Sequence, residues 1–258
     1  MRKPFMMGVV ASCVLFVFIA SPHAQLIKKI QFSAAEGYTD GLLVGQPAGG
    51  DSQWTAASTV QGDNTFTIQN EAMLVHPDGS SVIWVYMPFP AQKKNIITVT
   101  WDWQYFGPPE KKMDLGFTTS DSVNFMVDGD PFTVFNEQCT PTRMGDVVDA
   151  RRGNDLAGGG DWISDNGVEY RDGALIHMRM VVDSVEWMFD VFAQRDGEDE
   201  VQVADDFLFR RAPSVETDGV NCITHWLNGG DPETSVVLDN YLIVGPNPIT
   251  DVNDWNLF

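Results

Sequence analysis

Hydrophobic and polar residues alternate along the chain in short runs, with almost no helical periodicity. Runs rich in β-branched and aromatic residues are separated by Gly, Asp, Asn and Pro, which is typical of an all-β protein. About ten such runs without intervening helices predict one domain built from two packed antiparallel sheets. The predicted strands are Thr65–Ile68, Ser81–Met87, Ile96–Tyr105, Asp114–Thr118, Asn124–Val127, Val147–Ala150, Ala174–Asp183, Trp187–Gln194, Ile223–Trp226 and Ser235–Val244, and Val201–Phe209 fits either a strand or an exposed turn.

Three of these runs have one apolar and one polar face. In residues 96–105, 174–183 and 187–194, apolar side chains take every second position. Successive side chains point to opposite faces of a strand, so the polar residues of each run share one side. If the three strands belong to one sheet, a polar surface results. Its predicted members are Asp102, Gln104, His177, Arg179, Asp190 and Gln194.

Residues 1–24 have the pattern of a secretory signal peptide. Arg2 and Lys3 precede an apolar run that ends near Ala20, and cleavage is expected after Ala24. The run is shorter than the roughly 20 residues of a membrane-spanning helix. The alternative is a lipoprotein box ending at Cys13, but the residues after it are apolar where a lipoprotein becomes polar. We expect a secreted, periplasmic or cell-surface protein whose single mature domain spans residues 25–258.

Acidic residues outnumber basic ones by 36 to 16, which gives the chain a net charge of −20. Removal of the first 24 residues, which carry two bases and no acid, makes it −22. Nucleic acids and anionic membranes are excluded as partners because they require clustered Lys and Arg. No later segment has the length and hydrophobicity of a membrane span. The charge favours ligands that are neutral, cationic, or anionic and bridged by calcium.

Two cysteines remain after the expected cleavage, Cys139 and Cys222. In an oxidising compartment they predict a disulfide. The alternative is a pair of buried thiols.

Three stretches resemble the concanavalin A-like lectin/glucanase superfamily, as found in secreted bacterial jelly-roll domains. Residues 32–41, with Gly45, Gln46 and Trp54, resemble its opening. Residues 177–183 followed by 189–192, and residues 237–244, resemble its later strands. The resemblance implies a two-sheet antiparallel jelly-roll β-sandwich. It leaves function open, because the superfamily includes lectins, carbohydrate-binding modules, hydrolases and lyases. The E-x-D-x-x-E strand of laminarinase-like hydrolases and the Q-[IV]-H strand of alginate lyases are both missing.

The leading catalytic hypothesis is a polysaccharide lyase, which needs a base, an acid and a cation. His177, Tyr170 and Arg179 supply these roles, and Arg151 and Arg152 supply further cations. His177 and Arg179 are two residues apart on one strand and leave the same face. The alternative is that these polar residues have no catalytic role.

A glycoside hydrolase is a second hypothesis, because it needs two carboxylates about 5–10 Å apart. Asp102 and Asp190 are the candidates, although a chain with 36 acids places some on any surface.

Tryptophan near glycine-rich loops suggests sugar contact. His225 and Trp226 precede such a loop, and Trp162 follows another; the alternative is that these indoles are core. Calcium is the favoured ion because Asp and Asn in loops suit a hard cation, with Asp128, Asp130 and Asp239 as candidates and solvated acids as the alternative.

The sequence thus predicts a protein that binds a polysaccharide or surface glycan on a concave sheet face. A lyase or hydrolase is the first alternative, and a structural envelope protein is the second. The expected ligand-binding residues are Asp102, Gln104, Arg151, Arg152, Trp162, Asp190, Gln194, His225 and Trp226.

Overall fold

The computed structural model describes residues 25–56, 65–77, 83–108, 113–120, 137–144, 147–212 and 219–245. Within these ranges most of the chain is strand, and its one helical element is the short 3-10 turn η1 (Ala34–Glu36). The strands are β1 (Gln25–Ile30), β2 (Gly41–Leu42), β3 (Thr55–Ala56), β4 (Phe66–Gln69), β5 (Ala72–Val75), β6 (Ile83–Lys93), β7 (Ile96–Phe106), β8 (Met113–Ser120), β9 (Glu137–Met144), β10 (Val147–Arg152), β11 (Asp161–Glu169), β12 (Leu175–Asp183), β13 (Met188–Arg195), β14 (Val201–Leu208), β15 (Gly219–Gly230) and β16 (Ser235–Gly245). The all-β prediction is confirmed, and the predicted strand Asn124–Val127 lies outside the described residues.

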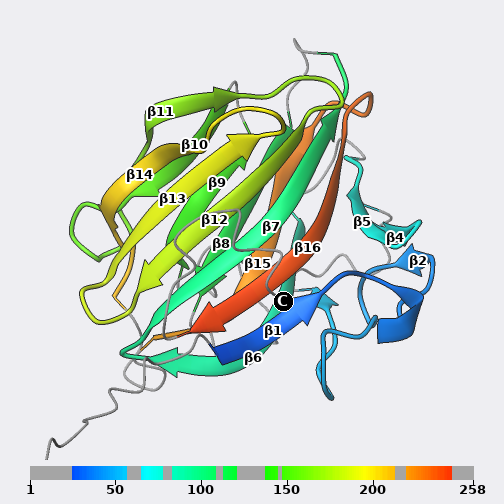
Figure 1. Ribbon diagram of the computed structural model, residues 1–258, viewed down its shortest axis with the longest axis horizontal. Helices are drawn as coiled ribbons and strands as arrows, with labels where there is room; N and C mark the ends of the chain where they lie inside the picture. Colours follow the sequence, from blue (N-terminus) through cyan, green and yellow to red (C-terminus); the bar gives the residue numbers. More distant parts are fainter. Residues whose placement is uncertain are drawn as a thin grey trace, which may run out of the picture.

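The strands form two sheets that lie one behind the other (Figure 1). The nine-stranded sheet has the order β14-β13-β12-β7-β16-β5-β4-β2, with β1 also paired to β16. The seven-stranded sheet has the order β11-β10-β9-β8-β15-β6-β3. Neighbouring strands are antiparallel throughout, so the predicted two-sheet sandwich is confirmed. A search of the described residues for a helix capable of spanning a bilayer finds none.

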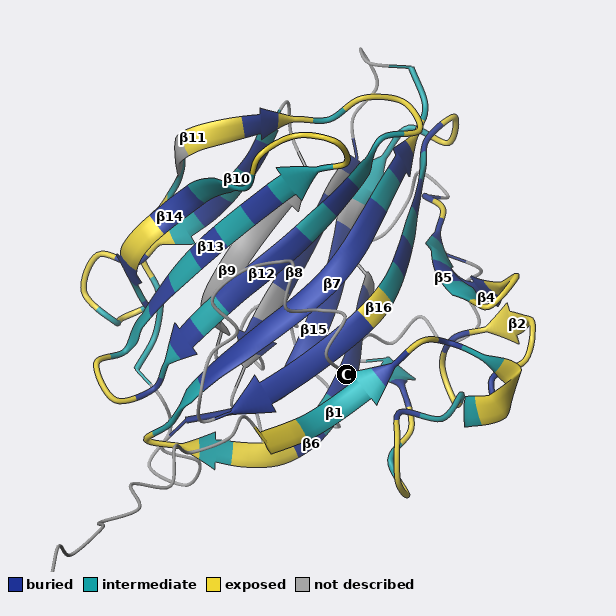
Figure 2. Cartoon of the chain, in the orientation of Figure 1, coloured by how far each residue is buried: buried dark blue, intermediate teal, exposed yellow. Residues whose placement is uncertain are grey.

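The core fills the space between the sheets with alternate side chains from both (Figure 2). Trp101 of β7 lies flat against Phe117 of β8, with 3.9 Å between ring centroids and 6° between planes. Met178 and Met180 of β12 are fully buried beside them. Burial of each large apolar side chain contributes roughly 1.5–3 kcal/mol, so these inner faces hold the sheets together.

The predicted disulfide between Cys139 and Cys222 is not formed, because a strand separates the two residues. Cys139 of β9 pairs with Thr119 of β8, which pairs in turn with Ile223 of β15, next to Cys222. Two interstrand spacings amount to about 10 Å, whereas bridged Cα atoms lie about 4.4–6.8 Å apart. Cys222 is instead a buried thiol with its Sγ atom 3.8 Å from Thr224 Oγ1.

An aromatic cluster lies on the outer face of the seven-stranded sheet. We call Trp84, Tyr86, Trp162 and Trp226 the outer aromatic cluster. The ring of Trp226 lies 5.9 Å from that of Trp84 and 6.3 Å from that of Trp162, measured between centroids. Trp226 reaches across β8 at Gly116, where a Cβ atom would lie only 1.9 Å from the indole. The glycine therefore makes the room in which this cluster packs.

We expect Gly116→Ala to destabilise the protein by about 1–3 kcal/mol, the usual range for overpacking a filled site. For a domain of this size, such a loss lowers the Tm by several degrees. Thermal unfolding followed by circular dichroism measures it. Gly159→Ala is the matched control, because a Cβ there meets only ordinary contacts of 3.6 Å or more. Equal Tm values for the two variants would contradict the packing described.

Candidate functional site

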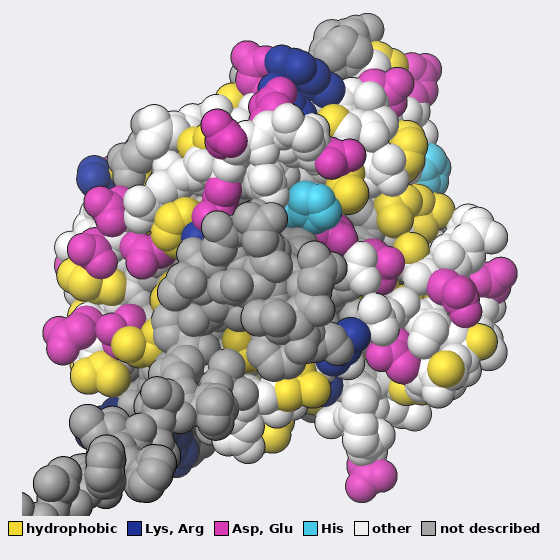
Figure 3. All heavy atoms as spheres, in the orientation of Figure 1, with side chains coloured by type: hydrophobic (Ala, Val, Ile, Leu, Met, Phe, Trp, Pro, Cys, Tyr) yellow, Lys and Arg dark blue, Asp and Glu magenta, His cyan; other side chains and the backbone are white. Residues whose placement is uncertain are grey.

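The predicted polar surface exists on the outer face of the nine-stranded sheet. His177 of β12 lies opposite Asp102 of β7 on one side and opposite Gln194 of β13 on the other. The three strands are thus neighbours, and the register gives their polar side chains one common face. On the visible part of this side of the molecule, Figure 3 shows acidic and uncharged groups with hydrophobic groups among them.

The most ordered feature of this face is a row of three hydrogen-bonded side chains, the His177–Asp102–Asn240 chain. His177 Nδ1 donates to Asp102 Oδ1 at 2.6 Å, and Asn240 Nδ2 donates to Asp102 Oδ2 at 2.7 Å. Asp102 is buried, whereas the His177 side chain remains 25% exposed. Both carboxylate oxygens therefore accept a bond, and they fix an imidazole and an amide on an accessible surface.

A bulge in β16 places Asn240 in this row. The pairing of β16 with β7 shifts register between Asp239 and Leu242, and Asn240 has a left-handed backbone with φ +56°. Asn adopts this conformation more readily than most residues. A regular strand would have placed residues 239 and 240 on opposite faces, so simple alternation in the sequence does not predict the contribution of Asn240.

The electrostatics of the His177–Asp102–Asn240 chain favour a protonated His177 imidazole. The hydrogen bond that His177 donates to Asp102 raises the pKa of His177, burial opposes this, and the charges of Asp102 and Asp196 add to the rise. Nearby, the pKa of Asp239 is raised to about 6, above all by burial and then by the negative charges of Asp102, Glu36 and Glu71, while a hydrogen bond from the Asn240 backbone N–H opposes the rise. This part of the face is therefore acidic, and it contains groups that titrate close to neutral pH.

The guanidinium of Arg179 is bound by other groups of the protein. It is buried, its Nε and Nη2 atoms donate to Glu200 at 3.0 and 2.6 Å, and its guanidinium lies 3.7 Å from the ring centroid of Phe192. A guanidinium held by a bidentate carboxylate and a ring is already neutralised. It cannot also neutralise the carboxylate of an incoming uronic acid.

Gln104 and Gln194 hold the loops beside the polar face. The Gln104 amide donates to the Gly173 carbonyl at 2.9 Å, and the Gln194 amide donates to the Glu198 carbonyl at 2.8 Å. These bonds fix the borders of the face.

Asp190 does not pair with Asp102 as a glycosidase would require. Its Oδ1 accepts from the Asp206 backbone N–H at 2.8 Å, and burial raises its pKa. Asp190 lies opposite Val181, four residues along β12 from His177 and one strand farther from β7. Those steps amount to about 16 Å, beyond the roughly 5–10 Å that two catalytic carboxylates need.

Two candidate residues lie in the core rather than on the surface. The ring of Tyr170 stacks 6.5 Å from Trp103, its hydroxyl is buried, and burial followed by the charge of Asp149 raises its pKa. His225 is fully buried with Nε2 2.7 Å from the Tyr241 hydroxyl, and burial lowers its pKa to about 3. The structure thus places the Tyr170 hydroxyl and the His225 ring away from the polar face, and their catalytic and sugar-binding roles stay predictions.

The remaining candidate ligand-binding residues lie on the seven-stranded sheet. Trp162 and Trp226 belong to the outer aromatic cluster, and the Arg151 guanidinium lies 5.6 Å from the Trp162 ring centroid. Arg152 lies near the ring of Phe207 on β14, at 5.9 Å. These four residues do not share a surface with His177, so the single predicted site is divided between two faces.

Only one of the three predicted calcium ligands lies among the described residues. Asp128 and Asp130 lie outside the described residues, and Asp239 lies beside Asp102, so calcium stays a prediction. Carboxylate oxygens of Asp190, Asp205 and Asp206 come within 4.8 Å of one another, which sequence reasoning missed. A break in the pairing of β14 with β13 places adjacent acids on one side, and the sequence carries no signal of it.

Comparisons with known proteins identify the fold. No protein-family model and no curated protein matches the chain. Among solved structures, one titled for endo-acting O-glycanases that human gut bacteria express to initiate mucin breakdown has a TM-score of 0.51 at 8% identity, over 85% of this chain and 99% of that chain. Lectin II from Ulex europaeus gives 0.47 at 8% identity, over 75% of this chain and 98% of the lectin. A sialidase gives 0.49 at 14% identity, over 78% of this chain and 17% of the sialidase. The likeness to the structure titled for O-glycanases, together with the two antiparallel sheets, confirms the predicted jelly-roll β-sandwich fold, and at these identities only the fold is shown.

The raised pKa of His177 predicts how pH affects stability. A base whose pKa is higher in the folded than in the unfolded state adds stability below the unfolded value of 6.5 and loses it as pH rises through the folded value. The free energy of unfolding of the wild type, minus that of His177→Gln, should therefore fall between pH 6 and 8.5. Urea titrations across this range measure the difference.

The comparison with His177→Gln removes the contribution of His225. Burial depresses the pKa of His225, so that residue destabilises the fold below pH 6.5 in both proteins and cancels in the difference. A difference that is constant with pH would show that Asp102 does not stabilise the imidazolium.

Proposed function

We propose that this protein binds a neutral polysaccharide or surface glycan on the outer face of the nine-stranded sheet. The observation that carries the proposal is the His177–Asp102–Asn240 chain. Sugar hydroxyls are bound by planar polar side chains whose positions are already fixed, because little entropy is then lost on binding. A partly exposed imidazole and an exposed amide, both held by one buried carboxylate, meet that requirement.

An aromatic side chain on the same face supports a sugar ligand. Phe106 ends β7 two residues after Gln104 and so faces the same side, and it is 38% exposed. It lies about 13 Å along the strand from Asp102, a span of more than one sugar ring. We propose that Phe106 stacks on one ring while the His177–Asp102–Asn240 chain binds hydroxyls of another.

The charge of the protein defines the class of glycan. With acids at more than twice the number of bases, the protein repels polyanions unless cations intervene. The carboxylates around Asp239 give this face the same sign. A neutral glycan is therefore the favoured ligand. The jelly-roll fold shared with a structure titled for O-glycanases supports a carbohydrate ligand, and the signal-like residues 1–24 support a place of action outside the cytoplasm.

The catalytic alternatives receive no support from the described geometry. A lyase needs an acid and a cation beside His177, but Tyr170 is in the core and Arg179 is bound to Glu200. The Asp102–Asp190 separation is too large for a glycosidase.

Binding of neutral glycans tests the proposal. We expect residues 25–258 to bind members of a neutral glycan array. Asp102→Ala removes two bonds to a charged group, each worth about 1.5–3 kcal/mol. It should weaken binding at least tenfold by isothermal titration calorimetry. Phe106→Ala removes an exposed ring, should leave the fold intact, and should weaken binding severalfold.

The matched control is Glu186→Gln, an exposed acid in the turn between β12 and β13. It should bind as the wild type does. The proposal is wrong if no neutral glycan binds, or if binding survives Asp102→Ala and Phe106→Ala but is lost in Trp162→Ala. The latter result would move the site to the seven-stranded sheet.

A further inference from the structure

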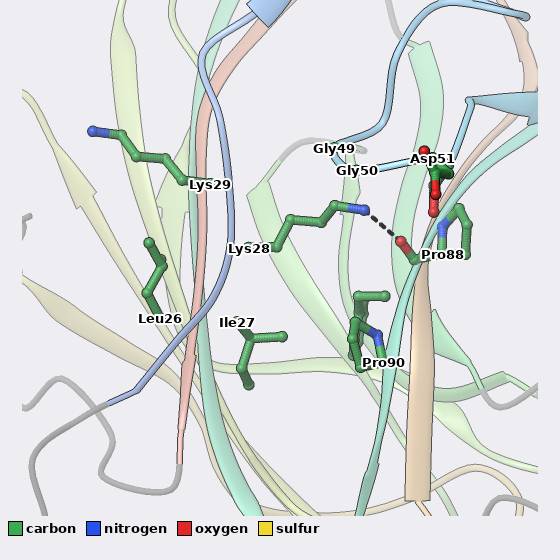
Figure 4. A pocket seen from close by; sticks show the side chains of 11 residues that line it. Leu26, Ile27, Lys28, Lys29, Gly49, Gly50, Asp51, Pro88 and Pro90 are labelled. Carbon is green, nitrogen blue, oxygen red and sulfur yellow. Dashed lines mark hydrogen bonds between the residues drawn. The ribbon is translucent and has the colours of Figure 1, made fainter.

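A cavity of about 650 Å³ lies at one edge of the sandwich, on elements that the proposed glycan face does not use. It is partly open to solvent and is lined by β1, the turn at residues 49–52 and residues 88–90 of β6 (Figure 4). Its volume is within the roughly 300–1,000 Å³ of small-molecule sites. Most of its wall is apolar, formed by Leu26, Ile27, Pro88, Phe89 and Pro90.

Lys28 projects across this cavity, whereas the adjacent Lys29 points away from it (Figure 4). The Lys28 Nζ atom donates to the Pro88 carbonyl at 2.6 Å. Gly49 lies against the end of the same side chain, since a Cβ at this position would come within 2.9 Å of Lys28 Cε. The amine is thus fixed in position between the turn and β6.

The surroundings of Lys28 favour a neutral amine. Its described hydrogen-bond partner is an uncharged carbonyl, which stabilises an ammonium less than a carboxylate does. The prolines at positions 88 and 90 have no N–H. Of the described residues that line the cavity, the charged ones besides Lys28 are Asp51 in its wall and Lys29, whose side chain points away from it. Burial alone lowers the pKa of Lys28 to about 8. A neutral lysine in an apolar pocket is the activated form of this nucleophile.

We propose that Lys28 captures a small apolar aldehyde in this cavity and condenses with it to form an imine. The Nζ lone pair attacks the carbonyl carbon, and a C–N bond forms. The carbonyl oxygen leaves as water with two protons from the amine, and a C=N bond remains. The step is redox-neutral and needs no further reactant. The apolar wall binds the rest of the aldehyde, and the Pro88 carbonyl orients the amine.

Reductive trapping tests this inference. The mature protein is incubated with benzaldehyde and sodium cyanoborohydride at pH 7.5, digested and mapped by mass spectrometry. We expect benzyl-Lys28 to form about ten times faster than the adduct at Lys29. The rate at Lys28 should rise with pH and level off above about 8, whereas the rate at Lys29 should continue to rise.

Two controls separate capture in the cavity from reactivity of the amine alone. Lys28→Arg should remove the fast-labelled site, and Lys29→Arg should leave it unchanged. Glyceraldehyde, which is polar, should lose the preference for Lys28 because the wall does not bind it. Labelling of Lys28 no faster than Lys29, or an equal preference with glyceraldehyde, would overturn the proposal. Glycan binding should be the same in Lys28→Arg, so failure of either proposal leaves the other intact.

Discussion

The register between β7 and β12 is the constraint on which both the core and the candidate site depend. It places Asp102 opposite His177 and Trp101 opposite Met178. Because side chains alternate, a slip of one residue would turn the polar side chains into the core and the tryptophans into water. The stacking of Trp101 on Phe117 makes such a slip costly. Apolar packing inside the sandwich therefore determines where the hydrogen-bonded chain lies outside it.

The polar groups that this register brings together are not explained by their contribution to the stability of the fold. A buried carboxylate such as Asp102 loses hydration, and its two hydrogen bonds return only part of that free energy. Apolar residues of similar volume are often equally stable at such positions. The bidentate pair of Arg179 and Glu200 is also polar and shielded from water, but it ties β12 to the residue that precedes the edge strand β14. The His177–Asp102–Asn240 chain joins strands inside the sheet and holds no edge strand, which argues for a role in binding.

The sequence predicted those features that depend on period-two alternation. The shared face of Asp102, His177 and Gln194 followed from it, because all three strands are regular and adjacent. The prediction did not extend to Asn240, since a bulge in β16 breaks the alternation where that residue joins the row. Local deviations of this kind depend on tertiary packing, and a single sequence carries little signal of them.

Errors of a second kind came from the order of strands in the sheets. Alternation shows to which face of its strand a side chain points. It shows neither the sheet to which that strand belongs nor the strand that lies next to it. The disulfide between Cys139 and Cys222 was predicted because two cysteines remain in an expected oxidising compartment, although β8 lies between their strands. Tyr170 was joined to His177 by chemistry, although it follows β11 of the other sheet and packs on Trp103. The turn at Gly49 and the prolines of β6 likewise meet Lys28 only in three dimensions.

The two outer faces differ in what they still offer a ligand. On the seven-stranded sheet, Trp84 and Trp226 are buried against each other, so their apolar surface is already removed from water. An interaction that is already satisfied within the protein adds little to binding. On the nine-stranded sheet, His177 keeps part of its surface exposed while its geometry is fixed by Asp102. Fixed but accessible polar groups gain most from a ligand, and for this reason we propose the glycan site on the nine-stranded sheet and not at the outer aromatic cluster.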